Sequence, residues 1–220
     1  DVAFWRGLTF YLERHRGGSV ETRDFLRALE DATGRSLEET FHEWVERPGH
    51  PDLEVRVENG DEAVRLTITQ KQADNALFHM TLPVIVATDE AVIRHQLEVS
   101  RKSETFALPT GGQRARMVIV DPDMTAPGSV KLELPVAMLI RQLEAAEQAR
   151  PRWCAARALG TRNEPRAVRA LAKAREEDAS WAVRLEAAKA LGEQRTDGAF
   201  EALCAAENDP DARVRRAVAT

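Results

Sequence analysis

The sequence predicts a multi-domain α+β protein: a short helical segment, then an antiparallel β-sandwich, then an α-solenoid. Three observations predict this fold class. Apolar residues recur at helical spacing up to about residue 50, at every second residue up to about residue 134, and then again at helical spacing in a pattern that repeats. A chain of 220 residues has room for about two or three domains of ordinary size.

The stretch VAFWRGLTFYLERHR is predicted to be the first of three short amphipathic helices within residues 1–50. Large apolar residues fall on one stripe of it: Phe4, Leu8, Tyr11 and Leu12. Gly17 and Gly18 end this helix, because glycine is favoured just past a helix terminus. Such short helices need a partner surface on which to bury their apolar faces.

Two further helices are predicted from their capping residues. In TRDFLRALEDATG, Thr22 is the expected N-cap and Gly34 the stop. In SLEETFHEWVERPG, Ser36 and Glu39 have the spacing of a capping box, and the helix ends before Pro48.

From residue 51 to residue 134 the apolar period is two. Representative inward-facing residues are Leu53, Val55, Val57, Val64, Leu66, Ile68, Met80, Leu82, Val84, Val86, Ile93, Leu97 and Val99. Turn residues such as Gly111–Gly112 and Pro127–Gly128 separate about seven short runs of this kind. This pattern indicates an antiparallel β-sandwich of immunoglobulin-like size.

Residues 135–220 contain an internal repeat. The segment WCAARALG (153–160) aligns with LEAAKALG (185–192) at an offset of 32, and a third copy begins near Val214. Paired helices with alanine seams at a fixed period indicate an α-solenoid, and the repeats are best described as HEAT-like. The third copy stops at Thr220 inside its first helix. We therefore expect the chain to be a piece of a longer protein at this end, and also at Asp1, where no cap precedes the first helix.

The stretch FHEWVERPGHPDL invites a comparison with zinc sites. A zinc helix of the HExxH type needs two histidines four residues apart, with a glutamate between them as the base. Here the residue four after His42 is Glu46, and His50 lies beyond a Pro-Gly break. An exposed helix residue and a turn residue are the simpler interpretation of the two histidines.

No other catalytic or binding constellation is present. His15, His79 and His95 have no common spacing, and Tyr11 lies on an apolar stripe, where a core role is expected. There is no nucleophile motif, no phosphate-binding glycine loop and no complete calcium loop. We therefore predict no catalytic, cofactor-binding or metal-ligating residue in this chain.

The composition limits the choice of partners. The formal net charge of −5 gives no reason to expect nucleic acid, and no apolar run approaches the length of a membrane span. Two cysteines, Cys154 and Cys204, are expected to be buried unpaired thiols. The sequence does not predict a cellular location.

Taken in order, these parts resemble the C-terminal region of an aminopeptidase N-like (gluzincin) zinc metallopeptidase. The resemblance is densest between residues 3 and 57. The matching residues are Gly7, Leu8, Tyr11, Leu12, Thr22, Asp24, Phe25, Ala28, Gly34, Leu37, Phe41, Trp44, Pro48, Gly49, Pro51 and Leu53.

The resemblance implies a division of labour. Residues 1–50 would be the terminal helices of the peptidase catalytic domain, residues 51–134 a β-sandwich spacer, and residues 135–220 a truncated helical domain that limits access to the active site. The family's HExxH motif, its later glutamate ligand and its catalytic tyrosine match no residue here. The chain alone is therefore expected to bind no zinc and to cleave nothing.

The parent protein would use zinc to remove N-terminal residues from peptides, with the N-terminal catalytic domain of the same polypeptide as partner. The alternative is a non-enzymatic interaction scaffold, because the family includes members without peptidase activity and HEAT-like repeats are common in scaffolds. Whether the parent is an enzyme therefore stays open at this point.

Overall fold

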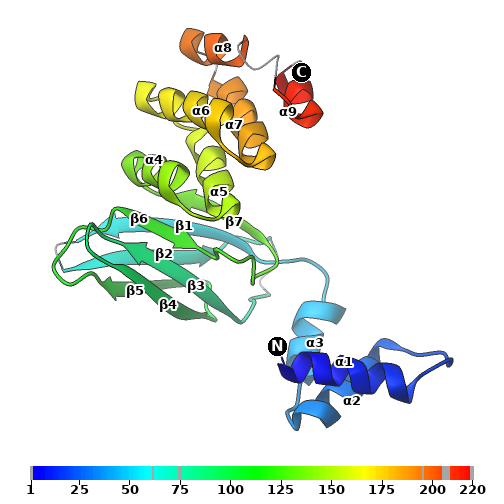
Figure 1. Ribbon diagram of the computed structural model, residues 1–220. Helices are drawn as coiled ribbons and strands as arrows, with labels where there is room; N and C mark the ends of the chain where they lie inside the picture. The colour runs from blue at the N-terminus through cyan, green and yellow to red at the C-terminus, as the bar shows by residue number, and fades with distance from the viewer. Residues whose placement is uncertain (1, 61, 74–75, 195, 205–208, 219–220) are drawn as a thin grey trace. The chain divides into compact units, whose positions relative to one another are not determined.

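The computed structural model describes residues 2–60, 62–73, 76–194, 196–204 and 209–218 (Figure 1). They fall into two compact units with the bounds Asp1–His50 and Pro51–Thr220, and each unit is described by itself. Along the chain, helices are followed by strands and then by helices again, which confirms the predicted fold class.

The first unit is a small helical assembly. Its elements are α1 (Val2–Arg14), α2 (Thr22–Thr33), α3 (Glu38–Phe41) and a π-helical turn, η1 (His42–Glu46). Its core consists of buried Leu26, Leu29 and Phe41, with Phe25 and Leu37 packed against them. The core draws mainly on α2 and α3, so these two elements supply most of the unit's apolar burial.

Helix α1 buries less of its apolar stripe than predicted. Gly7 is its buried residue, whereas Phe4 is 46% and Leu12 59% exposed. A Cβ added at residue 7 would come within 2.6 Å of Leu29 Cδ2. The absence of a side chain at residue 7 therefore lets α1 lie close to α2. The larger apolar side chains of α1 lie outside this contact between the two helices.

The predicted starts of two helices are wrong. Glu21, not Thr22, is the N-cap of α2, where it forms a reciprocal capping box with Asp24. Leu37, not Ser36, precedes α3, and it makes no side-chain cap. A carboxylate and a hydroxyl can both accept hydrogen bonds from backbone N–H groups, so either of two adjacent residues can be the N-cap. The spacing of apolar residues does not distinguish between them.

The second unit begins with the predicted β-sandwich. Its strands are β1 (Asp52–Asn59), β2 (Ala63–Gln70), β3 (Met80–Ala87), β4 (Val92–Val99), β5 (Ser103–Pro109), β6 (Met117–Val120) and β7 (Ser129–Glu133). One sheet has the order β5-β2-β1-β7 and the other the order β4-β3-β6. Alternate residues of β1 and β2 are buried, as the period of two predicts.

One strand pair departs from the antiparallel arrangement that predominates in this predicted sandwich. Strand β7 runs parallel to β1, with Leu53 opposite Val130 and Val55 opposite Leu132. The other described strand pairs are antiparallel. The preceding strand β6 belongs to the other sheet, so the chain crosses between sheets before β7 and enters beside β1 in the parallel sense. Strand β7 is thus an edge strand of the four-stranded sheet.

Strand β3 is buried on both faces over its last half, which a simple alternation does not predict. Ile85 and Ile119 form a cluster with Ala146, and Met117 packs against it. Ala146 directly follows helix α4 (Val136–Ala145), so the start of the helical region covers the outer face of the β4-β3-β6 sheet.

The rest of the second unit is a stack of helix pairs. After α4 come α5 (Ala149–Leu159), α6 (Pro165–Glu177), α7 (Trp181–Gln194), α8 (Asp197–Cys204) and α9 (Ala212–Val218). Helix α7 packs against both α5 and α9, while α6 packs against α4 and α8, which gives two layers of helices (Figure 1). The predicted solenoid is confirmed; the last residues of its third copy, 219–220, lie outside the described residues.

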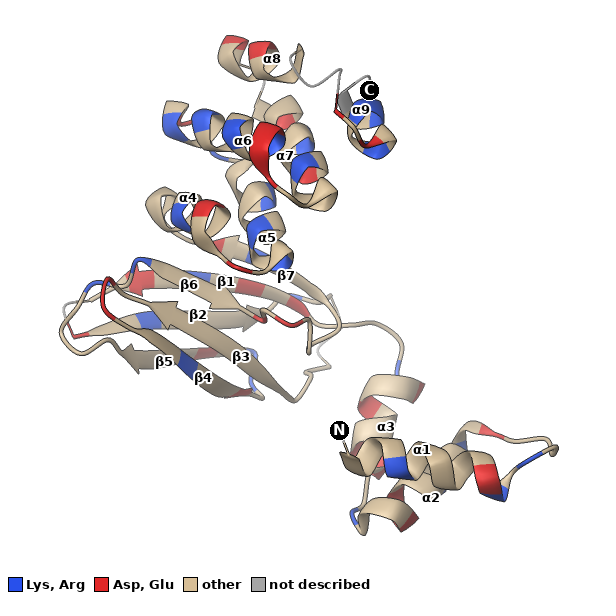
Figure 2. Cartoon of the chain, in the orientation of Figure 1, with Lys and Arg blue, Asp and Glu red and all other residues tan. Residues whose placement is uncertain are grey.

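Both cysteines are free, as predicted, but only one is withdrawn from solvent. Cys154 on α5 is half-buried, whereas Cys204 at the end of α8 is exposed, so the expectation of two buried thiols is wrong. Lys, Arg, Asp and Glu are all present on the helices, and neither sign of charge is confined to them (Figure 2).

Candidate functional site

The histidines of the stretch 41–53 lie in different structural settings. His42 is in the π-helical turn, largely exposed, and its Nδ1 lies 3.5 Å from Glu46 Oε2. His50 lies beyond the turn, after Gly49, which has a left-handed φ of 96°. The contact between His42 and Glu46 brings together one imidazole and one carboxylate, fewer than the three protein ligands of a catalytic zinc.

The other candidate residues are scattered over the part of the chain that the structure describes. His15 follows α1 and stacks near Tyr11, with ring centroids 5.3 Å apart. Tyr11 itself is half-buried against Phe25. His79 precedes β3, and His95 is in β4. Among the described residues, no group of three or more His, Cys, Asp or Glu side chains could hold a metal ion, so the residues present do not fit the zinc site of a peptidase.

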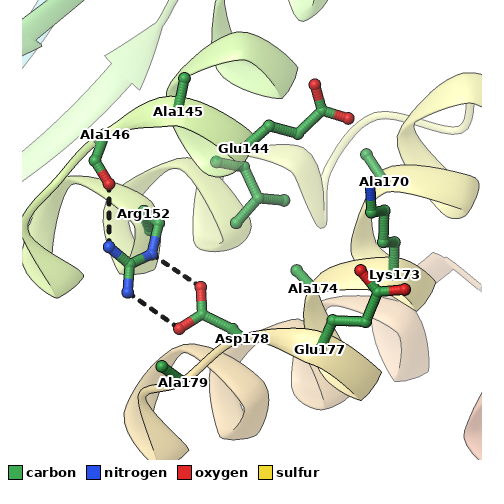
Figure 3. Close-up of a pocket in the computed structure, with 11 residues that line it drawn as sticks. Glu144, Ala145, Ala146, Arg152, Ala170, Lys173, Ala174, Glu177, Asp178 and Ala179 are labelled. Atoms are coloured by element: carbon green, nitrogen blue, oxygen red, sulfur yellow. Dashed lines mark hydrogen bonds and ion pairs between the residues drawn. The ribbon is translucent and has the colours of Figure 1, made fainter.

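The repeats carry an arginine–aspartate pair that sequence inspection missed. Arg152 on α5 donates to Asp178, with Nε–Oδ2 at 2.7 Å and Nη2–Oδ1 at 3.0 Å (Figure 3). In the next repeat, Arg184 on α7 donates to Asp209 at 2.8 and 3.1 Å. Both pairs are bidentate, the geometry that a guanidinium and a carboxylate favour.

Each arginine of this series also holds the loop that precedes its own helix. Arg152 Nη1 donates to the carbonyls of Ala146 and Glu147 at 2.9 and 2.8 Å. Arg215, in the third copy, donates to the carbonyls of Asp209 and Pro210. One guanidinium thus joins two successive loops, which fixes the relative orientation of neighbouring repeats. The recurrence of these arginines near the repeat offset marks them as part of the repeat, but it does not identify their aspartate partners.

These pairs shift the acidities of their members. The hydrogen bond from Arg184 holds the pKa of Asp209 below its ordinary value. The same interaction with Asp178 raises the pKa of Arg152. The Arg184–Asp209 pair is therefore charged throughout the neutral range, since the pKa of Arg184 is raised and that of Asp209 is lowered.

A pocket of about 340 Å³ lies beside the Arg152–Asp178 pair (Figure 3). Small side chains of α6, Ala170 and Ala174, form part of its wall, and Glu144, Lys173 and Glu177 contribute charged groups. The described residues that line it include no Ser, Thr, Cys or His side chain.

A larger cleft of about 600 Å³ lies between β7 and the helices α5 and α7. It is lined by Cys154, whose thiol pKa is raised chiefly by burial. It is also lined by Glu186, whose carboxyl pKa is raised by the same cause. A thiol with a raised pKa is less ionised at neutral pH and is therefore a weaker nucleophile.

Comparison with known proteins finds similarity to HEAT repeats and to aminopeptidases, the two resemblances that the sequence predicts. Residues 136–220 match the family model for HEAT repeats. Aminopeptidase N of Lactobacillus delbrueckii subsp. lactis is 36% identical over 72 residues, which is 33% of this chain and 8% of that protein. Alanine/arginine aminopeptidase of Saccharomyces cerevisiae is 28% identical over 119 residues, 49% of this chain and 13% of that protein.

The chain is also similar to a further curated protein and to a solved structure. Tricorn protease-interacting factor F2 of Thermoplasma acidophilum is 33% identical over 69 residues, 31% of this chain and 8% of that protein. The crystal structure of Legionella pneumophila aminopeptidase A in complex with aspartic acid superposes with a TM-score of 0.63 at 17% identity. That alignment covers 98% of this chain and 26% of the other, and it shows a shared fold. The chain thus matches only a small part of these much longer proteins.

Proposed function

Because this chain is an aminopeptidase N-like segment that carries HEAT repeats, we propose that it is the non-catalytic C-terminal part of an aminopeptidase. In the parent protein it would serve as an active-site wall, a spacer and a cover that limits access. The observation that carries this proposal is the fold similarity to an aminopeptidase over 98% of the chain. The rest of that protein's length would correspond to the parts that perform the chemistry.

We assign the wall to residues 1–50. Helix α1 leaves apolar side chains uncovered: Val2 is 85%, Trp5 62% and Leu12 59% exposed. Exposed apolar surface of this density on one short helix favours burial against another protein surface. The N-terminal catalytic domain of the same polypeptide is the partner that we propose for it.

The spacer and the cover correspond to residues 51–134 and 135–220. The sandwich has a continuous apolar interior that includes Leu66, Ile68 and Val84, none of them accessible to solvent. The helical repeats are linked by the arginine–aspartate pairs described above, which suits a cover that keeps its curvature. Neither part supplies a reacting group in this proposal.

The parent would hydrolyse the N-terminal peptide bond of peptides with a zinc ion held outside this chain. Zinc in such a site lowers the pKa of a bound water and polarises the substrate carbonyl. In the described part of the present chain, no helix is long and apolar enough to cross a membrane.

The proposal is tested by comparing the 220-residue chain with the complete polypeptide encoded by its gene. We expect zinc, measured by mass spectrometry, and hydrolysis of aminoacyl-4-nitroanilides in the complete polypeptide alone. Stoichiometric zinc and turnover in the isolated chain would overturn a non-catalytic role.

The cover is tested separately in the complete polypeptide. An Arg152→Met change, which unlinks two repeats, should raise hydrolysis of long peptides relative to aminoacyl-4-nitroanilides, because the former need a wider entrance. An unchanged ratio in a folded variant would contradict the access-limiting role.

An interaction scaffold is the second candidate, and the HEAT match to residues 136–220 favours it. Phe200 on α8 is 68% exposed and Trp181 on α7 is 37% exposed, so the repeats present apolar groups to a partner. A complete polypeptide that folds but holds no zinc and shows no turnover would favour the scaffold over the aminopeptidase.

A further inference from the structure

One edge of strand β7 has no neighbouring strand in the described residues, and one hydrogen bond shows which backbone groups of β7 face that edge. In the sheet order β5-β2-β1-β7, β1 is its single neighbour. Ser129 N donates to Pro51 O at 3.0 Å, so the backbone groups of Ser129 point toward β1. Because these directions alternate along a strand, the N–H and C=O groups of Val130 and Leu132 point away from β1.

Nothing in the described part of the chain completes this edge. The backbone of β7 makes no backbone hydrogen bond to α5 or α7 there. The strand, Ser129–Glu133, contains no proline that would remove an outward donor. Outward N–H and C=O groups in a row are a template for one further strand.

The space beside the edge is the cleft of about 600 Å³ already described. All five residues of β7 line it, and the facing wall comes from α5 and α7. Five extended residues span about 17 Å, since a strand rises about 3.3 Å per residue. The cleft therefore runs along a length of strand that a short extended peptide can pair with.

The charges of the cleft favour a cationic occupant. Its lining includes the acidic residues Asp52, Glu133, Glu186 and Glu193 and the basic residues Lys131, Arg157 and Lys189. The ammonium of Lys131 is taken up by Glu133 at 2.7 Å and by Glu54 at 3.6 Å. Burial raises the pKa of the Glu186 carboxyl. It outweighs Lys189, Arg157 and a hydrogen bond with the Trp153 side chain, which favour the charged form.

We propose that an extended peptide segment with one basic side chain docks in this cleft by adding a strand to the edge of β7. Its main chain bonds to Val130 and Leu132, and its basic group approaches Glu186. Burial of Glu186 supports this role, because a cation beside a desolvated carboxylate replaces the water that the carboxylate has lost. This site does not depend on the proposed function as wall, spacer and cover.

The main-chain part of the proposal is tested with a five-residue blocked peptide of alternating threonine and valine with a central lysine. Titration into the 15N-labelled 220-residue chain should shift the amide signals of Val130 and Leu132 and slow their hydrogen exchange. A twin peptide with N-methylated amides should bind at least about tenfold more weakly, because it lacks the donors for the ladder. Absence of binding, or equal binding of both peptides, would overturn strand addition.

A matched pair of variants locates the site. Val130→Pro removes an outward N–H and leaves the ladder to β1 intact, so it should weaken binding by about tenfold. Ala107→Pro on β5, at the opposite edge of the same sheet, is the control. Gln70 N donates to Lys102 O, so the backbone groups of Lys102 point toward β2. Because the directions alternate along β5, the N–H of Ala107 points away from β2, as that of Val130 points away from β1. Equal effects of the two changes would place the peptide elsewhere.

The charge part is tested with Glu186→Gln. The unchanged chain should prefer the lysine peptide to a twin with central glutamate, and the variant should lose most of this preference. A preference that survives the change would remove Glu186 from the site. Thermal unfolding of every variant establishes that it is folded, and the N-methylated peptide tests the proposal without any variant.

Discussion

Arg152 and Asp178, 26 residues apart, form a bidentate ion pair with side chains that are only 15% and 7% exposed. The same guanidinium holds two carbonyls of the loop between α4 and α5. A single side chain therefore connects the start of one repeat to the start of the next. Arg184 repeats the arrangement with Asp209.

Breaking this link is expected to be costly. Arg152→Met keeps most of the side-chain volume but removes the guanidinium from two carbonyls and from Asp178, which then accepts, among the described residues, only from the backbone N–H of Ser180. Loss of one partner from a buried pair costs about 3 kcal/mol of unfolding free energy. Chemical denaturation followed by circular dichroism would measure it.

The matched control is Arg166→Met. Arg166 also lies 2.7 Å from a carboxylate, that of Glu164, but both side chains are about half exposed. An exposed pair contributes about 0.5 kcal/mol or less, so this change should be nearly neutral. Equal losses in the two variants would show that burial does not set the strength of these links.

The repeats should weaken in acid. The side-chain hydrogen bond from Arg213 lowers the pKa of Asp211 from 3.8 to about 2. A carboxyl group with a lowered folded-state pKa stabilises the fold above its unfolded value of about 4, and this contribution is lost as the pH falls toward 2. Asp209, lowered by Arg184, acts in the same direction.

Melting temperatures between pH 5 and pH 2 would follow this loss. We expect a smaller decrease in Asp211→Asn than in the unchanged chain, because the variant has no carboxyl group to protonate at that position. A variant with the same pH profile as the unchanged chain would show that Asp211 does not contribute.

Periodicity predicted the kinds of elements but not their long-range pairing. The change of period near residue 51 and the repeat offset of 32 come from burial on one face, which each segment encodes locally. The parallel pairing of β7 with β1 depends on where the chain crosses between sheets, and SVKLE carries no signal of strand direction. The cleft at the β7 edge could therefore not be predicted from the sequence.

The same limit explains the missed arginine–aspartate pairs. The repeat offset gave no reason to connect Arg152 or Arg184 to an aspartate about 25 residues further along the chain. That connection requires the helices to be stacked first. Likewise, Ile85 looked like an outward-facing strand residue, and only the packing of Ala146 against it explains its burial.

Gly7 on α1 should not tolerate a side chain. Alanine has the higher helix propensity, but its Cβ would lie 2.6 Å from Leu29 Cδ2, and Leu29 is buried in the core. Gly7→Ala is therefore expected to destabilise the first unit by about 1–2 kcal/mol, as overpacking does. Denaturation followed by tryptophan fluorescence would measure the change.

Gly18→Ala provides the comparison, since the nearest atom to its added Cβ is His15 O at an ordinary 3.6 Å. This variant should retain the stability of the unchanged chain. In a Leu29→Ala background, Gly7→Ala should cost less stability than it does in the unchanged chain, because the atom that the new methyl group meets is gone. Greater stability in Gly7→Ala would show that helix propensity outweighs the close contact.

The two thiols should react at very different rates. Cys204 is exposed, whereas Cys154 is half-buried and burial raises the pKa of its thiol. Because the thiolate is the reactive form, a disulfide reagent such as 5,5′-dithiobis(2-nitrobenzoate) at pH 8 should label Cys204 first and Cys154 more slowly by at least about tenfold. Cys204→Ser should abolish the fast phase and Cys154→Ser the slow one. Fast labelling of Cys154 in the folded chain would mean that the cleft between β7 and α5 opens readily to solvent, and that its β7 edge is accessible without a change of fold.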